Sequence, residues 1–316
     1  MSLFRHRLPQ LGNRLFLTDG GLETTLIYHE KLALPCFAAF ALLKDDAGAA
    51  ALQAYFRSYT EIARSRGVGI VLESATWRAN PDWAAQLGYD AIALAEANRR
   101  AIELLTDIRE ALQTPATPVV ISGNLGPRGD GYRAEARMTA IEARDYHAPQ
   151  VDTFAATAAD MVAAFTLNYI DEAVGITMAA QEAAMPVAIS FTVETDGRLP
   201  SGETLADAVQ RTDQATGGYP AYFLINCAHP AHFADTLRAG GAWRERIRGL
   251  RANASRRSHA ELDACTELDV GDPQELAADC VALRRVLPRL SVIGGCCGTD
   301  HRHIAALCDH WQGQAG

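Results

Sequence analysis

Short apolar runs alternate with longer amphipathic segments along the whole chain. Eight of these runs predict buried parallel strands, because they are apolar over successive residues and rich in β-branched or aromatic side chains. The predicted strands cover residues 14–19, 69–75, 118–124, 161–166, 187–193, 221–227, 246–252 and 290–295. Helical segments are predicted between and after them, at 49–66, 91–112, 143–158, 169–184, 204–215, 230–239, 273–287 and 300–311.

This alternation of strands and helices predicts an α/β protein. Eight successive strand-and-helix units indicate one (β/α)8 TIM barrel, with residues 1–316 as a single domain. An open doubly wound sheet is the alternative. It is disfavoured because the first predicted strand leads into Asp19-Gly20-Gly21, which is too short to form the glycine-rich phosphate cradle of such sheets.

Composition narrows the possible partners. A net charge of −9 argues against nucleic-acid binding. The chain has no amino-terminal signal pattern and no apolar run long enough to span a bilayer, so no membrane association is expected. Seven cysteines without the spacing of a disulfide framework are typical of a reducing compartment. We therefore expect a cytoplasmic protein whose cysteines bind metal or pack in the core.

Three cysteines stand where predicted strands end. Cys227 closes the sixth predicted strand, and Cys296 and Cys297 follow the eighth within a Gly-Gly-Cys-Cys-Gly turn. In a barrel the carboxyl ends of the strands surround the active site, so these thiols should converge over its mouth. This arrangement predicts an open zinc site with three cysteine ligands. The alternative is that they are inert thiols buried in the core.

The other cysteines show no such convergence. Cys36, in the connection after the first strand, is a candidate for a fourth ligand. Cys265, Cys280 and Cys308 fall in predicted loops or helices, and we expect them to pack there.

The predicted metal site suggests a reaction. Three thiolates outweigh the charge of one zinc ion, so the site is a weak Lewis acid for hydrolysis but suits a soft fourth ligand. A substrate thiol would lose its proton on binding and would then attack an electrophilic carbon at neutral pH. The expected chemistry is alkyl transfer to sulfur.

Several segments resemble the motifs of one enzyme family. Segments 17–25 (LTDGGLETT), 225–230 (INCAHP) and 293–299 (IGGCCGT) are similar to the three hallmark motifs of the homocysteine S-methyltransferase family, and segments 146–150 and 187–202 resemble its middle blocks. The resemblance covers nearly the whole chain. It implies a (β/α)8 barrel enzyme that moves a methyl group to the homocysteine thiolate, giving methionine.

The resemblance also implies roles for individual residues. It makes Cys227, Cys296 and Cys297 the ligands of Zn²⁺, and it places Asp19 beside the amino group of the substrate. Gly20 and Gly21 would let the backbone approach the substrate closely. The implied partners are small molecules, namely a thiol acceptor and a methyl donor.

Two departures from the family pattern affect the acceptor. Phe165 stands where the family usually has a glutamate that binds the substrate ammonium. The second strand ends in Glu73-Ser-Ala-Thr-Trp77 where the family commonly has Thr-Asn-Thr-Phe, so Glu73 is a candidate replacement anion. Asn226 is placed with the substrate-binding residues, although orienting the loop that carries Cys227 is the favoured interpretation. The acceptor is therefore homocysteine or its selenium analogue, or a different thiol.

Residues outside these motifs are interpreted more simply. Trp77 and Trp83 are candidates to stack on a cationic methyl donor, with ordinary loop packing as the alternative. The arginine cluster at 244–257 is expected to be one solvated face.

The chain lacks the motifs that two other classes of barrel enzyme need at their strand ends. A Schiff-base aldolase needs a lysine at a strand end, but Lys31 and Lys44 lie outside every predicted strand. A zinc hydrolase of the amidohydrolase type would have His-x-His where this chain has Thr18-Asp19-Gly20. A barrel that keeps zinc for a structural or thiol-sensing role is the non-enzymatic alternative. Elimination favours a sulfonium donor, S-methylmethionine or S-adenosylmethionine, and a monomer is plausible, because the chain has no cobalamin or folate module and no carboxyl-terminal oligomerisation segment.

Overall fold

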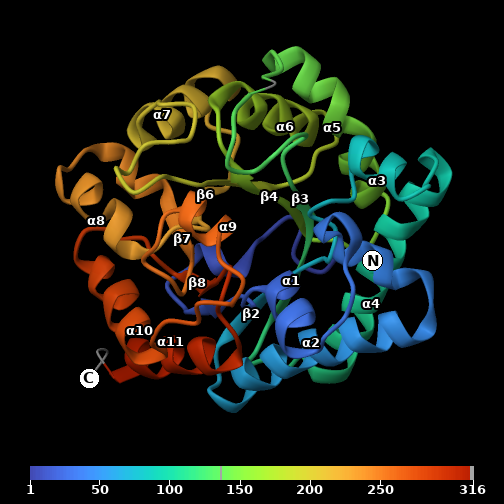
Figure 1. Ribbon diagram of the computed structural model, residues 1–316, viewed down its shortest axis with the longest axis horizontal. Helices are drawn as coiled ribbons and strands as arrows, with labels where there is room; N and C mark the ends of the chain where they lie inside the picture. Colours follow the sequence, from blue (N-terminus) through green and yellow to red (C-terminus); the bar gives the residue numbers. More distant parts are fainter. Residues whose placement is uncertain (136, 314–316) are drawn as a thin grey trace.

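The computed structural model describes residues 1–135 and 137–313, which form a closed barrel of eight parallel strands in sequence order (Figure 1). The strands are β1 (Phe16–Leu17), β2 (Gly69–Glu73), β3 (Val119–Leu125), β4 (Met161–Leu167), β5 (Val187–Phe191), β6 (Tyr222–Asn226), β7 (Ile247–Ala252) and β8 (Val292–Gly295). Strand β1 pairs with both β2 and β8, which closes the ring. The prediction of a (β/α)8 barrel is confirmed, and the open-sheet alternative is wrong.

Most of the helices surround the barrel on its outside, while α1 (Leu22–Thr24) and α9 (His259–Asp263) lie over its open end (Figure 1). The other helices are α2 (Asp46–Ser65), α3 (Pro81–Gln86), α4 (Ala91–Leu112), α5 (Ala140–Ala155), α6 (Ile170–Glu182), α7 (Leu205–Thr216), α8 (Pro230–Arg238), α10 (Pro273–Ala282) and α11 (His301–Gly313). Their amino termini are set by local chemistry. Asp45 caps α2, Asp272 caps α10 ahead of a first-turn proline, and Thr139 and Glu142 form a capping box on α5.

The structure differs from the predicted elements at several places. The first strand is only Phe16–Leu17, because its neighbours pair with just these two residues. Helix α10 ends earlier than predicted and continues as a short 3-10 turn at Leu283–Arg285. The short helices α1, α3 and α9 were not predicted, since each is too brief to show an apolar period.

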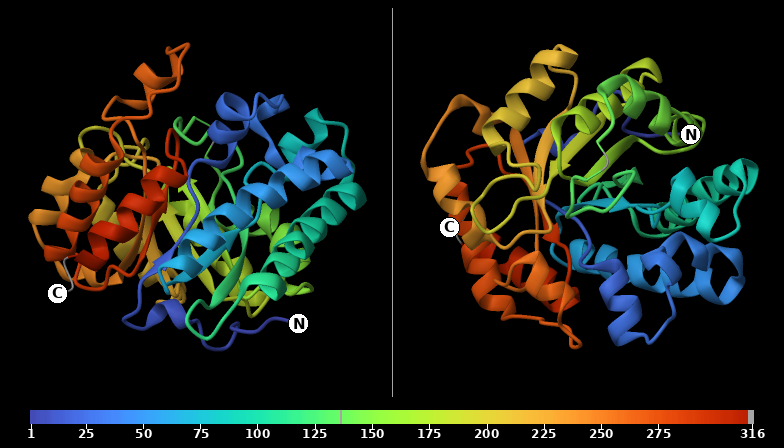
Figure 2. Two further views of the ribbon diagram at one scale, coloured as in Figure 1. Left: turned by 90° about the horizontal axis from the view of Figure 1, so that it is seen from below. Right: turned by 45° about the horizontal axis from the view of Figure 1, so that its top comes forward.

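Two layers of apolar side chains hold the barrel together. One fills the interior and includes Phe16, Val71, Val120 and Met161, while a larger one lies between the strands and the outer helices. The amino-terminal segment runs across one end of the barrel, and α9 rises from the opposite end (Figure 2, left). None of the helices in the described part of the chain is long and apolar enough to cross a membrane.

Candidate metal centre

The three cysteines predicted to bind metal meet at the end of the barrel from which α9 rises. Cys227 follows β6, and Cys296 and Cys297 follow β8, so the loops after two non-adjacent strands bring them together. Their sulfur atoms all lie within 4.8 Å of one another. Thiolates bound to one zinc ion at about 2.3 Å are roughly 3.8 Å apart, so the cluster fits such an ion after small side-chain movements.

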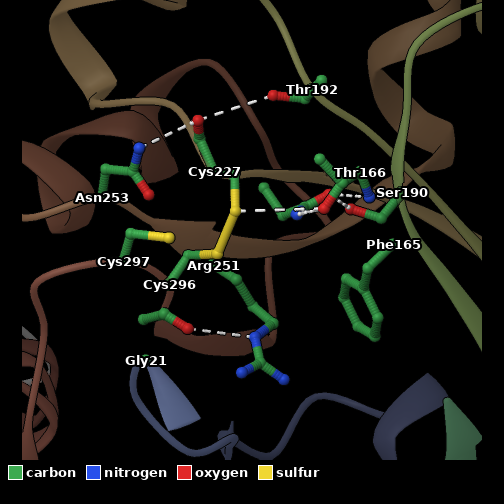
Figure 3. Close-up of a disulfide and its surroundings, with 12 residues drawn as sticks. Gly21, Phe165, Thr166, Ser190, Thr192, Cys227, Arg251, Asn253, Cys296 and Cys297 are labelled. Carbon is green, nitrogen blue, oxygen red and sulfur yellow. Dashed lines mark hydrogen bonds between the residues drawn. A yellow bond between two sulfur atoms is a disulfide. The ribbon is translucent and has the colours of Figure 1, made fainter. Parts of the chain in front are cut away.

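The oxidation state of this cluster matters for metal binding. Cys227 and Cys296 are joined by a disulfide, and Cys297 is a free thiol (Figure 3). The cluster therefore offers three thiolates only in the reduced protein, after the disulfide has taken up two electrons and released two thiol groups. Burial raises the pKa of the Cys297 thiol to about 11. A bound cation would reverse this effect, because metal ligands bind in the deprotonated form.

The backbone that presents Cys227 is held in an unusual conformation. Cys227 has φ of 52° and Thr166, at the end of β4, has φ of 62°, in the left-handed region that non-glycine residues rarely adopt. Each such residue costs on the order of 1–3 kcal/mol. The Asn226 side chain compensates, because its Oδ1 accepts from the Thr166 amide at 2.9 Å and from the Ser190 hydroxyl at 2.6 Å. Its Nδ2 also donates to Thr166 Oγ1 at 2.9 Å.

Replacing Asn226 with alanine is therefore expected to weaken zinc binding by about 10- to 100-fold, the usual cost of losing a group that orients a metal ligand. Competition with a chromophoric chelator measures this on reduced protein. Asn98→Ala is the matched control, because Asn98 is equally buried but lies in α4 and bonds to Leu94 O at 3.0 Å. Equal zinc affinity in the two variants would contradict this role for Asn226.

The glycines around the cluster permit its close packing. A Cβ atom on Gly21 would lie 2.5 Å from the Cys296 carbonyl oxygen, and one on Gly20 would lie 2.8 Å from the Thr299 carbonyl oxygen. A Cβ on Gly295 would overlap the Thr299 side chain. Gly20 and Gly21 therefore let the backbone pack closely against the loop that carries Cys296, and both also line the cleft where a substrate would lie.

A cleft opens beside the three cysteines. It is lined by every predicted substrate residue, namely Asp19, Gly20, Gly21, Glu73 and Asn226. Trp77 and Phe165 also line it, as do four residues that the sequence did not suggest: Glu23, Asn124, Tyr132 and Arg251. The structure therefore brings the predicted residues together in one place. Cys36 is not part of the metal-ligand cluster in the described chain; its sulfur lies 3.9 Å from Gln86 Oε1.

Arg251 is a site residue that sequence reasoning missed. It was expected in a solvated arginine face, but it is 8% exposed and its Nη2 lies 2.7 Å from Asp19 Oδ1. The prediction was wrong because Arg251 is the last residue but one of β7, where a side chain points into the barrel mouth. The position of Arg251 near the carboxyl end of a predicted strand was the available signal.

Asp19 has one hydrogen bond and one ion pair in the cleft, and its Oδ1 atom makes no hydrogen bond. Tyr55 donates a hydrogen bond to Asp19 Oδ2 at 3.1 Å, and Arg251 pairs with Oδ1. Burial raises the pKa of Asp19 above its ordinary value, and the positive charge of Arg251 opposes this shift. Glu23, another acid that the sequence analysis did not single out, has its pKa raised to about 7 by burial.

Glu73 is a buried acid without a complete set of partners. It is 3% exposed, and its Oε2 atom has no hydrogen-bond partner. Burial raises its pKa to about 7, although the charge of Arg251 acts in the opposite direction. An unpartnered carboxylate in a cleft is well placed to receive a cationic group.

Glu73→Gln is expected to stabilise the reduced, metal-free protein at pH 8. The folded state keeps the Glu73 proton between about pH 4.5 and 7 while the unfolded chain releases it, so the wild-type free energy of unfolding falls as pH rises through this window. Above pH 7 the penalty is on the order of 3 kcal/mol, and glutamine removes it. Urea unfolding of both proteins at pH 8 and pH 5 tests this. A gain of the same size at both pH values would contradict the assignment.

The aromatic candidates after β2 are already stacked. The guanidinium carbon of Arg78 lies 4.2 Å from the Trp77 ring centroid and 4.0 Å from that of Trp83. Trp77 still lines the cleft beside the cysteines, but Trp83 packs away from it. Other aromatic groups stand closer to the cluster, and the Tyr132 hydroxyl lies 4.0 Å from Cys297 Sγ.

Solved structures of other proteins share this barrel fold. The crystal structure of the homocysteine methyltransferase MmuM from Escherichia coli in its metallated form has a TM-score of 0.70 and 19% identity, over 97% of this chain and 99% of that one. The oxidized form of the same enzyme has a TM-score of 0.73 and 19% identity, over 96% of this chain and 99% of that one. Its apo form has a TM-score of 0.66 and 19% identity, over 97% of this chain and 100% of that one. At this identity the likeness shows the fold. No curated protein sequence is significantly similar to the chain.

A family model provides the stronger assignment. The model described as homocysteine S-methyltransferase matches residues 16–311, which include the segments that carry Asp19, Cys227, Cys296 and Cys297. The match confirms the resemblance seen in the motifs and extends it over almost the whole barrel. The chain therefore belongs to the homocysteine S-methyltransferase family and is a methyltransferase.

Proposed function

We propose that the protein binds Zn²⁺ through Cys227, Cys296 and Cys297 and transfers a methyl group from a sulfonium donor to the thiolate of homocysteine, giving methionine. The observation that carries the proposal is the convergence of three cysteine sulfurs within 4.8 Å at the wall of a cleft that also contains buried carboxylates. The soft donor set fits zinc. When bound, the ion would favour the thiolate form of the acceptor.

The residues of the chain would bind and orient the acceptor. Asp19 and Glu73 both line the cleft; Arg251 is already paired with Asp19, which leaves the Glu73 carboxylate for the acceptor ammonium group. Gly20 and Gly21 form the wall of the cleft next to the cysteine loop, and Asn226, the residue before Cys227, is itself fixed by hydrogen bonds to Thr166. In the transfer, the acceptor thiol gives up its proton, and its sulfur forms a bond to the methyl carbon. The bond between that carbon and the donor sulfur breaks, and the electron pair stays on the donor as a neutral thioether.

A second hollow supports a cationic donor. It adjoins the cleft at Cys297 and is lined by the aromatic rings of Tyr28, Phe37 and Tyr132. Four acidic residues and one arginine also line it, so negative charge predominates there: Asp130, Asp263, Glu267, Asp269 and Arg78. Aromatic faces and carboxylates both attract a sulfonium group, and a neutral donor would gain little from them. S-methylmethionine and S-adenosylmethionine are therefore the donors to test. We further propose that the protein acts on small molecules as a monomer.

The test begins with reduced protein loaded with zinc. We expect about one zinc ion per chain, and methionine formed from homocysteine with one of the two sulfonium donors. Zinc bound without turnover on any thiol would instead support a structural or thiol-sensing role. Absence of zinc binding by the reduced protein would overturn the metal assignment itself.

A further inference from the structure

Arg251 has donors to spare inside the cleft. Its Nε donates to Gly295 O at 3.0 Å, and its Nη2 donates to Gly20 O at 3.1 Å and pairs with Asp19. Its Nη1 group makes no hydrogen bond in the described part of the chain, yet it is not among the buried polar atoms that lack a partner. Nη1 is therefore open to the cleft. Because Gly295 precedes Cys296, the same side chain is tied to the loop that carries two of the sulfurs (Figure 3).

Phe165 keeps that donor free. The Phe165 ring lies under the guanidinium, with 5.0 Å between the Arg251 Cζ atom and the ring centroid. A carboxylate at this position would pair with Arg251 and occupy its donors, whereas an aromatic ring supports the cation without accepting its hydrogen bonds. Phe165, which departs from the family pattern, and the buried Arg251 therefore belong together: the ring supports the guanidinium and leaves its Nη1 donor free.

The cleft also separates positive from negative charge. Asp19 Oδ2 accepts from Tyr55, and Asp19 Oδ1, which makes no hydrogen bond, lies 2.7 Å from Arg251 Nη2, whereas Glu73 Oε2 on the β2 side has neither a hydrogen bond nor an ion pair within the described residues. Arg251 Nη1 is the free cationic donor on the β7 side. An α-amino acid carries one group of each sign on a single carbon, so one such molecule offers a partner to each of these two groups, which line the same cleft.

We propose that Arg251 binds the carboxylate of the acceptor and Glu73 binds its ammonium group, so that the site selects a thiol that is an α-amino acid. Asp19 is then a positioning residue, which fixes the arginine. The proposal rests on the proposed function for the identity of the acceptor, but not for its test. The two free groups are properties of the metal-free cleft, so they can be examined without catalysis.

The experiment uses three thioethers, which need no metal to bind. Methionine carries both charged groups, 4-(methylthio)butyrate lacks the ammonium group, and 3-(methylthio)propylamine lacks the carboxylate. Their dissociation constants are measured by calorimetry with reduced, metal-free wild type, Arg251→Met and Glu73→Gln. Arg251→Met should weaken methionine and the butyrate by roughly 10- to 100-fold and leave the amine within about threefold. Glu73→Gln should weaken methionine and the amine but not the butyrate.

Arg248→Met is the matched control, because Arg248 lies on the same strand but donates to Gly12 O, at the other end of the barrel. It should change none of the three constants. Uniform weakening of all three ligands by Arg251→Met would overturn the proposal and indicate a structural role. If Arg251→Met does not fold, the wild-type dissociation constants still test the proposal, which requires methionine to bind at least about tenfold more tightly than 3-(methylthio)propylamine. Failure of methyl transfer with this binding pattern intact would reject the proposed function and leave the carboxylate site standing.

Discussion

Replacing Cys296 with alanine is expected to abolish zinc binding and methyl transfer while leaving the barrel folded. The variant keeps only two of the three sulfurs, so zinc affinity should fall by well over about 100-fold, more than the loss of an orienting group costs. The fold should survive because the local hydrogen bonds of Cys296 are made by its backbone. Its amide donates to Ala252 O at 2.8 Å, and its carbonyl accepts from the Thr299 amide at 3.1 Å.

Zinc content by elemental analysis, transfer rate and circular dichroism test this variant together. Cys308→Ala is the control, since Cys308 is a free thiol in α11 that lies outside the three-cysteine cluster and lines neither the cleft nor the second hollow. It should keep both zinc and activity. Unchanged zinc content in Cys296→Ala would contradict the site.

Asp160→Ala should be the most damaging change for stability. Asp160 lies just before β4 and is fully buried, and it accepts from Arg109 Nη1 at 2.8 Å and from the Ile121 amide at 3.0 Å. It also accepts from the amides of Leu3 and Phe4 at 2.7 and 2.8 Å, which ties the amino-terminal segment across the barrel. Alanine would leave Arg109 as a buried charge without its partner. We expect a loss of about 3–5 kcal/mol in the free energy of unfolding.

Urea unfolding measures this loss. The control is Asp235→Ala, which removes an ion pair with Arg238 in which Asp235 is 96% exposed, so it should cost less than about 1 kcal/mol. The folded fraction of Asp160→Ala should still bind zinc with wild-type affinity, because Asp160 lies at the other end of the barrel from the cysteines. Equal losses for the two variants would show that the buried pair contributes little.

The fold and the cysteine cluster could be predicted for the same physical reason. Buried parallel strands appear in sequence as apolar runs with clear ends, and the barrel topology converts those ends into positions around one mouth. For this reason the sequence alone predicts that Cys227, Cys296 and Cys297 lie together. It also places Asp19 and Glu73 at the mouth, since both lie at the ends of apolar runs.

The remaining features depend on contacts that a sequence pattern does not encode. Arg251 was hidden among other arginines, and its importance comes from its partner Asp19, which is distant along the chain. The pairing of Cys227 with Cys296 depends on the oxidation state of the protein, which no spacing reveals. Helix α9 was missed for its brevity, although Ser258 and Glu261 form a capping box that marks its start.

The narrow seam between β1 and β8 gives the cysteine cluster a mechanical consequence. Strand β8 pairs with β1 through only two residue pairs, so few backbone hydrogen bonds hold it on that side. A cation bound by the cysteines in the loops after β6 and β8 would link β8 to β6 across β7 and so stabilise β8 on its other side. Loading the ion would then slow the opening of β8 and α11, and their amide protons would exchange with solvent more slowly than those of the empty protein.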